Sequence, residues 1–142
     1  MLEEGDSVPS FEVKNQDSEE LSSDSIKDAV IYFYPKADTS GCTTEACNFR
    51  DKIGSLDQAG IEVYGVSTDS VEEQNDFHDK YDLKFDLLAD ENGEVAEKFG
   101  VLQESGYAER TTFIVRNGEI EKVFRKVDPE DHVSDVLDYL EN

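Results

Sequence analysis

Residues 29–50 organise the rest of the chain and read AVIYFYPKADTSGCTTEACNFR. The run before the proline is apolar and rich in β-branched and aromatic side chains, which indicates a buried strand. A polar loop follows Pro35, and from about Thr39 to Gln58 apolar side chains recur at helical spacing until Gly60 ends the pattern. These residues therefore predict a strand, a loop and a helix, which together begin a parallel α/β unit.

Strand and helix patterns alternate on both sides of this unit. Besides a short strand around Val13, apolar runs predict later strands at residues 61–67, 85–89, 112–115 and 120–124. Helical spacing predicts later helices at residues 70–81, 95–99 and 129–140. The first of them opens with a capping box, Ser70 with Glu73, and Asn117-Gly118 joins the last two strands as a hairpin. We expect one α/β domain over residues 1–142, a thioredoxin-like mixed central β-sheet sandwiched by helices.

Acidic residues dominate the composition. The chain has 35 Asp and Glu against 13 Lys and Arg, a net charge of −22. Such a surface repels phosphates and anionic lipids, so we expect neither nucleic acid nor membrane as a partner. The acids are spread along the chain, a pattern that favours a halophilic protein, because in molar salt a Debye length of ~3 Å screens their repulsion. The alternative is an ordinary acidic protein.

The N-terminal residues, the length of the apolar runs and the net charge predict where the protein is located and whether it self-associates. Residues 1–6, MLEEGD, are acidic and lack the basic and apolar regions of a signal peptide. No apolar run approaches the roughly 20 residues that a membrane span needs. We therefore expect a cytoplasmic protein. The high net charge disfavours self-association, which predicts a monomer.

The two cysteines, Cys42 and Cys47, are the strongest candidates for chemistry. With Thr39 as N-cap, Cys42 falls in the first helical turn, where backbone N–H groups and the helix dipole stabilise an anion. Thiols in such places ionise readily and act as nucleophiles. Cys47 lies further along, beside the apolar stripe of the helix. The alternative is that both are inert, small core residues.

The spacing of the cysteines limits how they can pair. Five residues of ideal helix separate two Cα atoms by ~8.7 Å, whereas a disulfide tolerates at most about 7 Å. The pair can bond only if the first turns unwind, which suits a catalytic cycle better than a static crosslink. A zinc site is disfavoured because His78 and His132 show no ligand spacing, and we expect both on solvated, acidic helix faces.

Pro35, Thr39 and Cys42 form the pattern Pro-x-x-x-Thr-x-x-Cys, which resembles that of the peroxiredoxins. The longer string through Cys47 to Arg50 is similar to the bacterioferritin comigratory protein, or peroxiredoxin Q, subfamily, and the likeness covers nearly the whole chain. It extends to Gly5-Asp6, Pro9, Phe11, Ser67, Asp69, Phe77, residues 87–90 and residues 110–113. Ser40 stands where the subfamily usually has Pro, which loosens the helix start without removing a chemical group.

The resemblance implies a role for each matching residue. Cys42 would be the peroxidatic thiolate that a hydroperoxide oxidises to sulfenic acid, and Cys47 the resolving thiol that forms an intramolecular disulfide with it. Thr39 would hydrogen-bond the peroxide and Pro35 would shield the pocket. Arg110 would hold the thiolate and stabilise the departing oxygen. A thioredoxin-like dithiol would reduce the disulfide, and no metal or other cofactor is implied.

Three other functions remain open at this point. The protein could be a redox sensor or binding module that uses the same oxidised cysteine, because the chemistry at the thiol would be identical. It could be a thiol–disulfide oxidoreductase, although Thr111-Thr112 stands where a thioredoxin carries its cis-proline. It could also be a structural acidic protein, with inert thiols and Arg110 in an ordinary ion pair.

Overall fold

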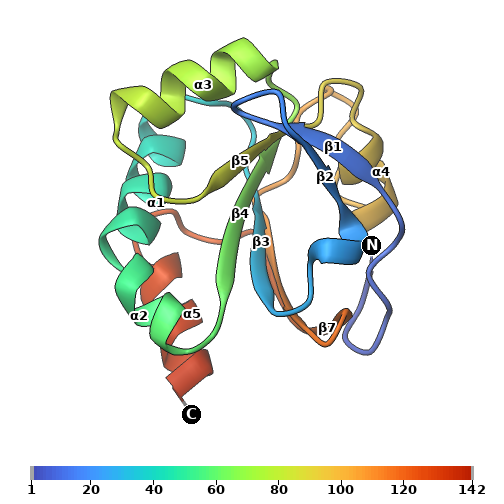
Figure 1. Cartoon of the computed structure of the whole chain (residues 1–142), viewed down its shortest axis with the longest axis vertical. Coiled ribbons are helices and arrows are strands. Elements are labelled where there is room, and N and C mark those ends of the chain that lie inside the picture. Colours follow the sequence, from blue (N-terminus) through green and yellow to red (C-terminus); the bar gives the residue numbers. More distant parts are fainter. Residues whose placement is uncertain (1, 142) are drawn as a thin grey trace.

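The computed structural model describes residues 2–141, which form a seven-stranded mixed sheet with helices on both faces (Figure 1). The strand order is β2-β1-β5-β4-β3-β6-β7. The strands are β1 (Glu12–Asn15), β2 (Glu20–Ser22), β3 (Ala29–Phe33), β4 (Glu62–Ser67), β5 (Asp86–Ala89), β6 (Thr111–Arg116) and β7 (Glu119–Arg125). The helices are α1 (Ser40–Asp51), α2 (Ile53–Gln58), α3 (Val71–Lys80), α4 (Glu94–Phe99) and α5 (His132–Glu141), with a 3-10 turn at Ser23–Ser25.

The buried strand β3 sets the direction of its neighbours. It pairs in parallel with β4 and antiparallel with β6, and the register places Phe33 opposite Thr111. The C-terminal end of β3 and the N-terminal end of β6 therefore lie side by side, at the same end of the central strands. Since Arg110 directly precedes Thr111, this pairing carries Arg110 to the edge where the chain turns from β3 into α1.

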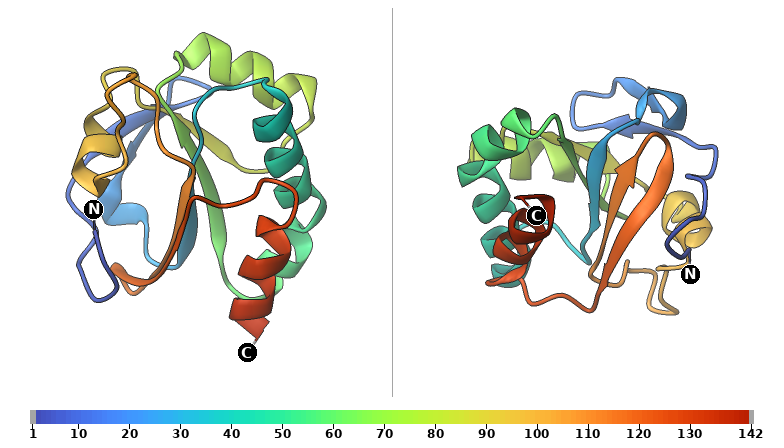
Figure 2. Two further views of the ribbon diagram at one scale, coloured as in Figure 1. Left: turned by 180° about the vertical axis from the view of Figure 1, so that it is seen from behind. Right: turned by 90° about the horizontal axis from the view of Figure 1, so that it is seen from below.

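Helices lie on both faces of the sheet (Figure 2), and an apolar core fills the space on each face. Helix α4 packs on one face, where Phe99 contacts Phe33 and Phe113 in a cluster of tilted rings. Helices α1, α2, α3 and α5 cover the other face. There the ring of Phe49 stacks on that of Tyr32, with centroids 4.6 Å apart. Helix α1 is thus fixed to the sheet by large buried rings.

The expected mixed α/β architecture is confirmed, with three local differences. The helix expected to Gln58 is two helices, because the amide of Lys52 (φ −107°, ψ 8°) bonds the carbonyl of Phe49 in 3-10 fashion. Strand β2 was not predicted, because three residues are too short to show an alternating pattern. Helix α5 begins at His132, and its first turn closes when the His132 amide bonds the Asp128 carbonyl.

Short-range signals set the remaining boundaries as expected. Ser70 and Glu73 form the predicted capping box at the start of α3. The hairpin between β6 and β7 turns at Asn117 (φ 54°) and Gly118 (φ 76°). Both residues are in the left-handed region that a type I′ turn requires. Within residues 2–141, no helix is long and apolar enough to cross a membrane.

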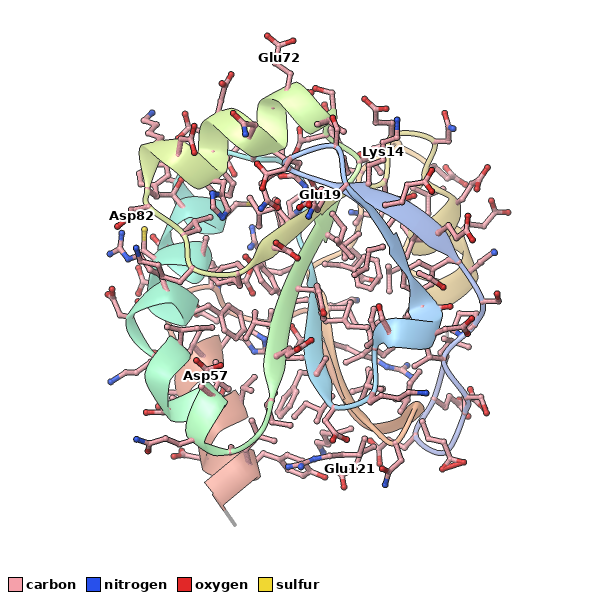
Figure 3. The ribbon with its side chains drawn as sticks, viewed as in Figure 1. Lys14, Glu19, Asp57, Glu72, Asp82 and Glu121 are labelled. Atoms are coloured by element: carbon pink, nitrogen blue, oxygen red, sulfur yellow. The ribbon has the colours of Figure 1, made fainter. Side chains whose placement is uncertain are left out.

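Acidic side chains cover the outside of every layer. Among those labelled in Figure 3, Asp57 comes from α2, Glu72 from α3, Asp82 from the turn after α3 and Glu121 from β7, and all four are exposed. Even if every Lys and Arg paired with one acid, the net charge of −22 would remain uncompensated. The folded state therefore carries a self-repulsion that dissolved ions can screen.

We predict that the thermal midpoint of unfolding rises from low-salt buffer to molar KCl. Each 1 kcal/mol of relieved repulsion would raise it by ~4 °C in a domain of this size. A double variant, Asp57→Lys with Glu72→Lys, removes charge at two exposed sites and should show a smaller rise. A midpoint that stays flat or falls with salt, or a variant with an equal rise, would contradict this account of the surface.

Candidate active site

Helix α1 follows β3 after a short loop, and Thr39 is its N-cap residue. Its backbone (φ −89°, ψ 159°) is that of an N-cap, and its carbonyl accepts from the amide of Thr43 at 2.8 Å. The Thr39 hydroxyl is exposed and donates to the carbonyl of Lys36 at 3.0 Å. Cys42 is the third residue of the helix, as the sequence predicts, and its side chain is buried at 1% exposure. The thiol thus sits at the positive end of α1, out of contact with bulk water.

The loop from Pro35 to the helix is pinned by two aspartates. Half-buried Pro35 follows β3, and the amide of Ala37 then donates to Asp69 at 2.7 Å. Asp38 accepts from the hydroxyl of Tyr81 at 2.6 Å, which ties the loop to the end of α3. Since both contacts come from the next α/β unit, the position of the helix start is fixed by the sheet and not by the loop alone.

Arg110 joins the thiol to a buried carboxylate. Its Nη2 donates to Cys42 Sγ at 3.2 Å, and its Nη1 donates to Glu45 Oε1 at 2.7 Å. The side chain of Arg110 is 17% exposed, whereas that of Glu45 is completely buried. A Cβ at Gly41 would lie 3.3 Å from Arg110 Nη2, so glycine leaves room for the guanidinium at the helix start. The single cation therefore faces two groups that can carry negative charge.

Glu45 and His132 form a buried polar cluster that we did not predict from the sequence. Burial raises the pKa of Glu45 to about 7, against the opposing charge and hydrogen bond of Arg110. Glu45 Oε2 has no hydrogen-bond partner within residues 2–141. His132 Nε2 lies 4.0 Å from this oxygen and 2.6 Å from Thr112 Oγ1. Burial, and after it the charge of Arg110, lowers the pKa of His132 to about 4, so the imidazole is neutral at pH 7.

The expectation that His132 is solvated was wrong, because its side chain is 1% exposed. It lies four residues before buried Val136 and next to buried Val133, so it falls on the apolar face of α5. This spacing is visible in the sequence and could have indicated burial. His78 is partly exposed, with its side chain at 24%. Glu45 has a similar signal, because it lies three residues after Cys42 and four before Phe49 on the buried face of α1. The partners that make this burial possible, Arg110 and His132, come from distant segments.

Cys47 lies in the second turn after Cys42 and is partly exposed. Both cysteines are free thiols, and α1 is continuous from Ser40 to Asp51 around them. The helix is thus in the wound state, in which the five-residue spacing holds the two Cα atoms too far apart for a disulfide. The structure therefore brings Cys42 and Arg110 into contact, and keeps Cys47 and the Thr39 hydroxyl outside that contact.

A helix-start thiol held by arginine on a thioredoxin-like sheet is the arrangement of a thiol-based redox enzyme. The AhpC/TSA family model matches residues 5–123. Peroxiredoxin Bcp of Escherichia coli is 38% identical over 98% of this chain and 96% of its own. The crystal structure of Peroxidoxin BcpB from Mycobacterium tuberculosis is 31% identical, with a TM-score of 0.92 over 99% of this chain and 97% of that one. Bacterioferritin comigratory protein from Xanthomonas campestris, described for its alkyl peroxide reduction activity, is 30% identical over 92% of this chain and 90% of that one, with a TM-score of 0.87.

This chain belongs to the AhpC/TSA family. Its similarity to the Bcp and peroxiredoxin Q proteins covers almost its whole length, as the motif around Cys42 predicts. It is a peroxiredoxin, a thiol-dependent peroxidase with the thioredoxin-like fold. Membership of the family implies a peroxide substrate and a thioredoxin-type reductant.

We predict that Arg110→Gln slows the alkylation of Cys42 by iodoacetamide at pH 6 to 7 by about 10- to 100-fold, the value of one hydrogen bond to a charged group. The guanidinium is the only charged donor bonded to Sγ among residues 2–141. Rates are measured in Cys47→Ser backgrounds so that one thiol reports. Arg116→Gln, at a partly exposed ion pair with Glu121, is the control and should leave the rate unchanged. Equal rates in all three chains would show that Arg110 does not support the thiolate.

Proposed function

We propose that this protein reduces hydroperoxides with Cys42 as peroxidatic thiolate and Cys47 as resolving thiol. The observation that carries the proposal is the 3.2 Å hydrogen bond from Arg110 Nη2 to Cys42 Sγ at the start of α1. Displacement on a peroxide oxygen needs an anionic nucleophile and a cation for the leaving oxygen. Arg110 supports both, since it stays charged and presents several N–H groups.

In the first step, the Cys42 thiolate attacks the terminal oxygen of the peroxide and the O–O bond breaks. The sulfur loses two electrons and becomes sulfenic acid, while the departing oxygen takes a proton and leaves as water or an alcohol. Thr39 would accept a hydrogen bond from the peroxide, because its own proton is donated to the carbonyl of Lys36. Pro35, half-buried beside the loop, would limit the access of water.

In the second step, the first turns of α1 unwind and Cys47 attacks the sulfenic sulfur, which releases water and forms the disulfide. A dithiol of the thioredoxin type then reduces the disulfide by exchange. The reaction sequence needs no metal or bound cofactor. We also propose that the protein acts as a cytoplasmic monomer in a salty cell. Its net charge disfavours self-association, and molar salt would screen the repulsion among its acidic side chains.

A single turnover in molar KCl tests the assignment of the two cysteines. One equivalent of hydrogen peroxide is added to reduced protein, and free thiols are titrated in the wild type, Cys42→Ser and Cys47→Ser. We expect the wild type to lose both thiols within seconds and Cys42→Ser to keep its thiol. Cys47→Ser should yield a sulfenic acid that dimedone traps. Survival of both wild-type thiols for minutes would overturn the proposal, and oxidation without turnover by added dithiol would favour a sensor.

We further predict that the surface charge selects against anionic peroxides. At low salt, kcat/KM for a carboxylate-bearing hydroperoxide should fall about tenfold below that for a neutral hydroperoxide of equal size. The two values should converge in molar KCl, where the repulsion is screened. Hydrogen peroxide is uncharged and serves as the control for any general effect of salt on the enzyme. A constant ratio at all salt concentrations would exclude steering by the acidic surface.

A further inference from the structure

The buried Glu45 carboxyl lies between the two cysteines in the chain. It is in the first half of α1, three residues after Cys42 and two before Cys47. The helix has to unwind in this region before the two sulfurs can meet. Contacts that stabilise the buried Glu45 side chain therefore stabilise the wound helix and oppose the resolving step. An unfavourable free energy of burying the carboxyl destabilises the wound helix and favours that step.

The two oxygens of the Glu45 carboxyl differ in their hydrogen bonding. Oε1 accepts from Arg110 at 2.7 Å, whereas Oε2 is buried without a hydrogen-bond partner among the described residues. Nε2 of His132 lies 4.0 Å from Oε2, beyond hydrogen-bond distance. That nitrogen is engaged at 2.6 Å with the hydroxyl of Thr112. An ionised Glu45 thus leaves one charged oxygen unpaired in the core, which is costly.

The titratable and charged groups that face Glu45 come from four elements. Arg110 precedes β6, His132 begins α5, Tyr32 lies on β3 and Cys42 is on α1 itself. His132 is neutral at pH 7, and the Tyr32 hydroxyl is buried with its pKa raised by burial. Arg110 is therefore the only charge that favours ionised Glu45 in this set, and it also serves Cys42.

We propose that Glu45 is a positioning residue for the resolving step: its protonated carboxyl holds α1 wound, and its ionisation favours the unwound helix in which Cys47 attacks Cys42. The proposal rests on the assignment of the two cysteines made above. The chemical step itself is unchanged: the S–O bond of the sulfenic acid breaks, its hydroxyl group leaves as water with the proton of the Cys47 thiol, and the disulfide forms without any external oxidant. Glu45 does not touch the reacting atoms and acts through the helix.

The direction of the pH effect follows from the two environments of the carboxyl. In the wound helix the pKa of Glu45 is raised to about 7 by burial, whereas in an unwound, hydrated segment it would return to about 4.3. The wound form therefore holds the proton more tightly. Protonation of Glu45 thus stabilises the wound helix relative to the unwound one. This stabilisation is complete below a pH of about 4.3 and is lost as the pH rises from about 4.3 towards 7. Acid should prolong the life of the sulfenic acid, and alkali should shorten it.

Glu45→Gln tests the proposal because it keeps an oxygen for Arg110 and cannot ionise. Sulfenic acid is formed with one equivalent of hydrogen peroxide, and its conversion to disulfide is followed by quenching with dimedone and mass spectrometry from pH 5 to 8. The pH dependence of the Cys47 thiol is common to both chains, so the ratio of their rates isolates Glu45. We expect similar rates at pH 5 and a wild type about tenfold or more faster at pH 8. Glu72→Gln, on the exposed face of α3, is the matched control and should follow the wild type.

A ratio that is constant from pH 5 to 8 would overturn the proposal. The absence of any trapped sulfenic acid in the Cys47→Ser chain would instead refute the assignment of the cysteines, so the two failures are distinguishable. If Glu45→Gln does not fold, hydrogen exchange in Cys42→Ser decides the question with Glu45 in place. Protection of the amides of residues 42–47, corrected for intrinsic exchange, should fall as the pH rises from 5 to 8. Unchanged protection would also overturn the proposal.

Discussion

The site depends on one guanidinium held between two potential anions. Arg110 bonds Cys42 Sγ at 3.2 Å and Glu45 Oε1 at 2.7 Å, and its own side chain is mostly buried, with 17% exposed. Breaking a buried ion pair by removing one partner typically costs about 3–5 kcal/mol. Loss of Arg110 would force Glu45 to take up a proton to limit that cost. The thiol and the carboxylate are therefore coupled through their shared cation and cannot be understood separately.

The pairing of strands in the sheet places Arg110 next to the Cys42 thiol. Because β6 runs antiparallel to β3 and Thr111 pairs with Phe33, the residue before β6 arrives at the start of α1. Gly41 then leaves the space that the guanidinium occupies, since a Cβ there would lie 3.3 Å from Nη2. An arginine far away in the sequence thus becomes a neighbour of Cys42 through hydrogen bonds between backbones, before any side-chain recognition is needed.

Local sequence patterns predicted most of the helices and strands, but they did not predict the contacts between segments that are distant in the sequence. The apolar run of β3, the Ser70 capping box and the Asn117-Gly118 turn each depend on a few adjacent residues. The break at Lys52 was missed because the apolar spacing continues across it into α2. The matching motif pointed to Cys42 and Arg110. The spacing of Glu45 to Cys42 and Phe49 places it on the buried face of α1, but the sequence does not show which partners a carboxyl would find there, because they come from β3, α5 and the segment before β6.

The acidic surface and the buried cation respond to salt in different ways. Dissolved ions screen charges that face water, but they have little effect on a pair in the low-dielectric interior. A net charge of −22 therefore acts on stability and on the approach of charged molecules, and salt can relieve it. The contact between Arg110 and Cys42 is partly buried, so dissolved ions screen it less than they screen the charges that face water. The chain can in this way carry an extreme surface charge while the environment of its thiol is set by Arg110 and Glu45.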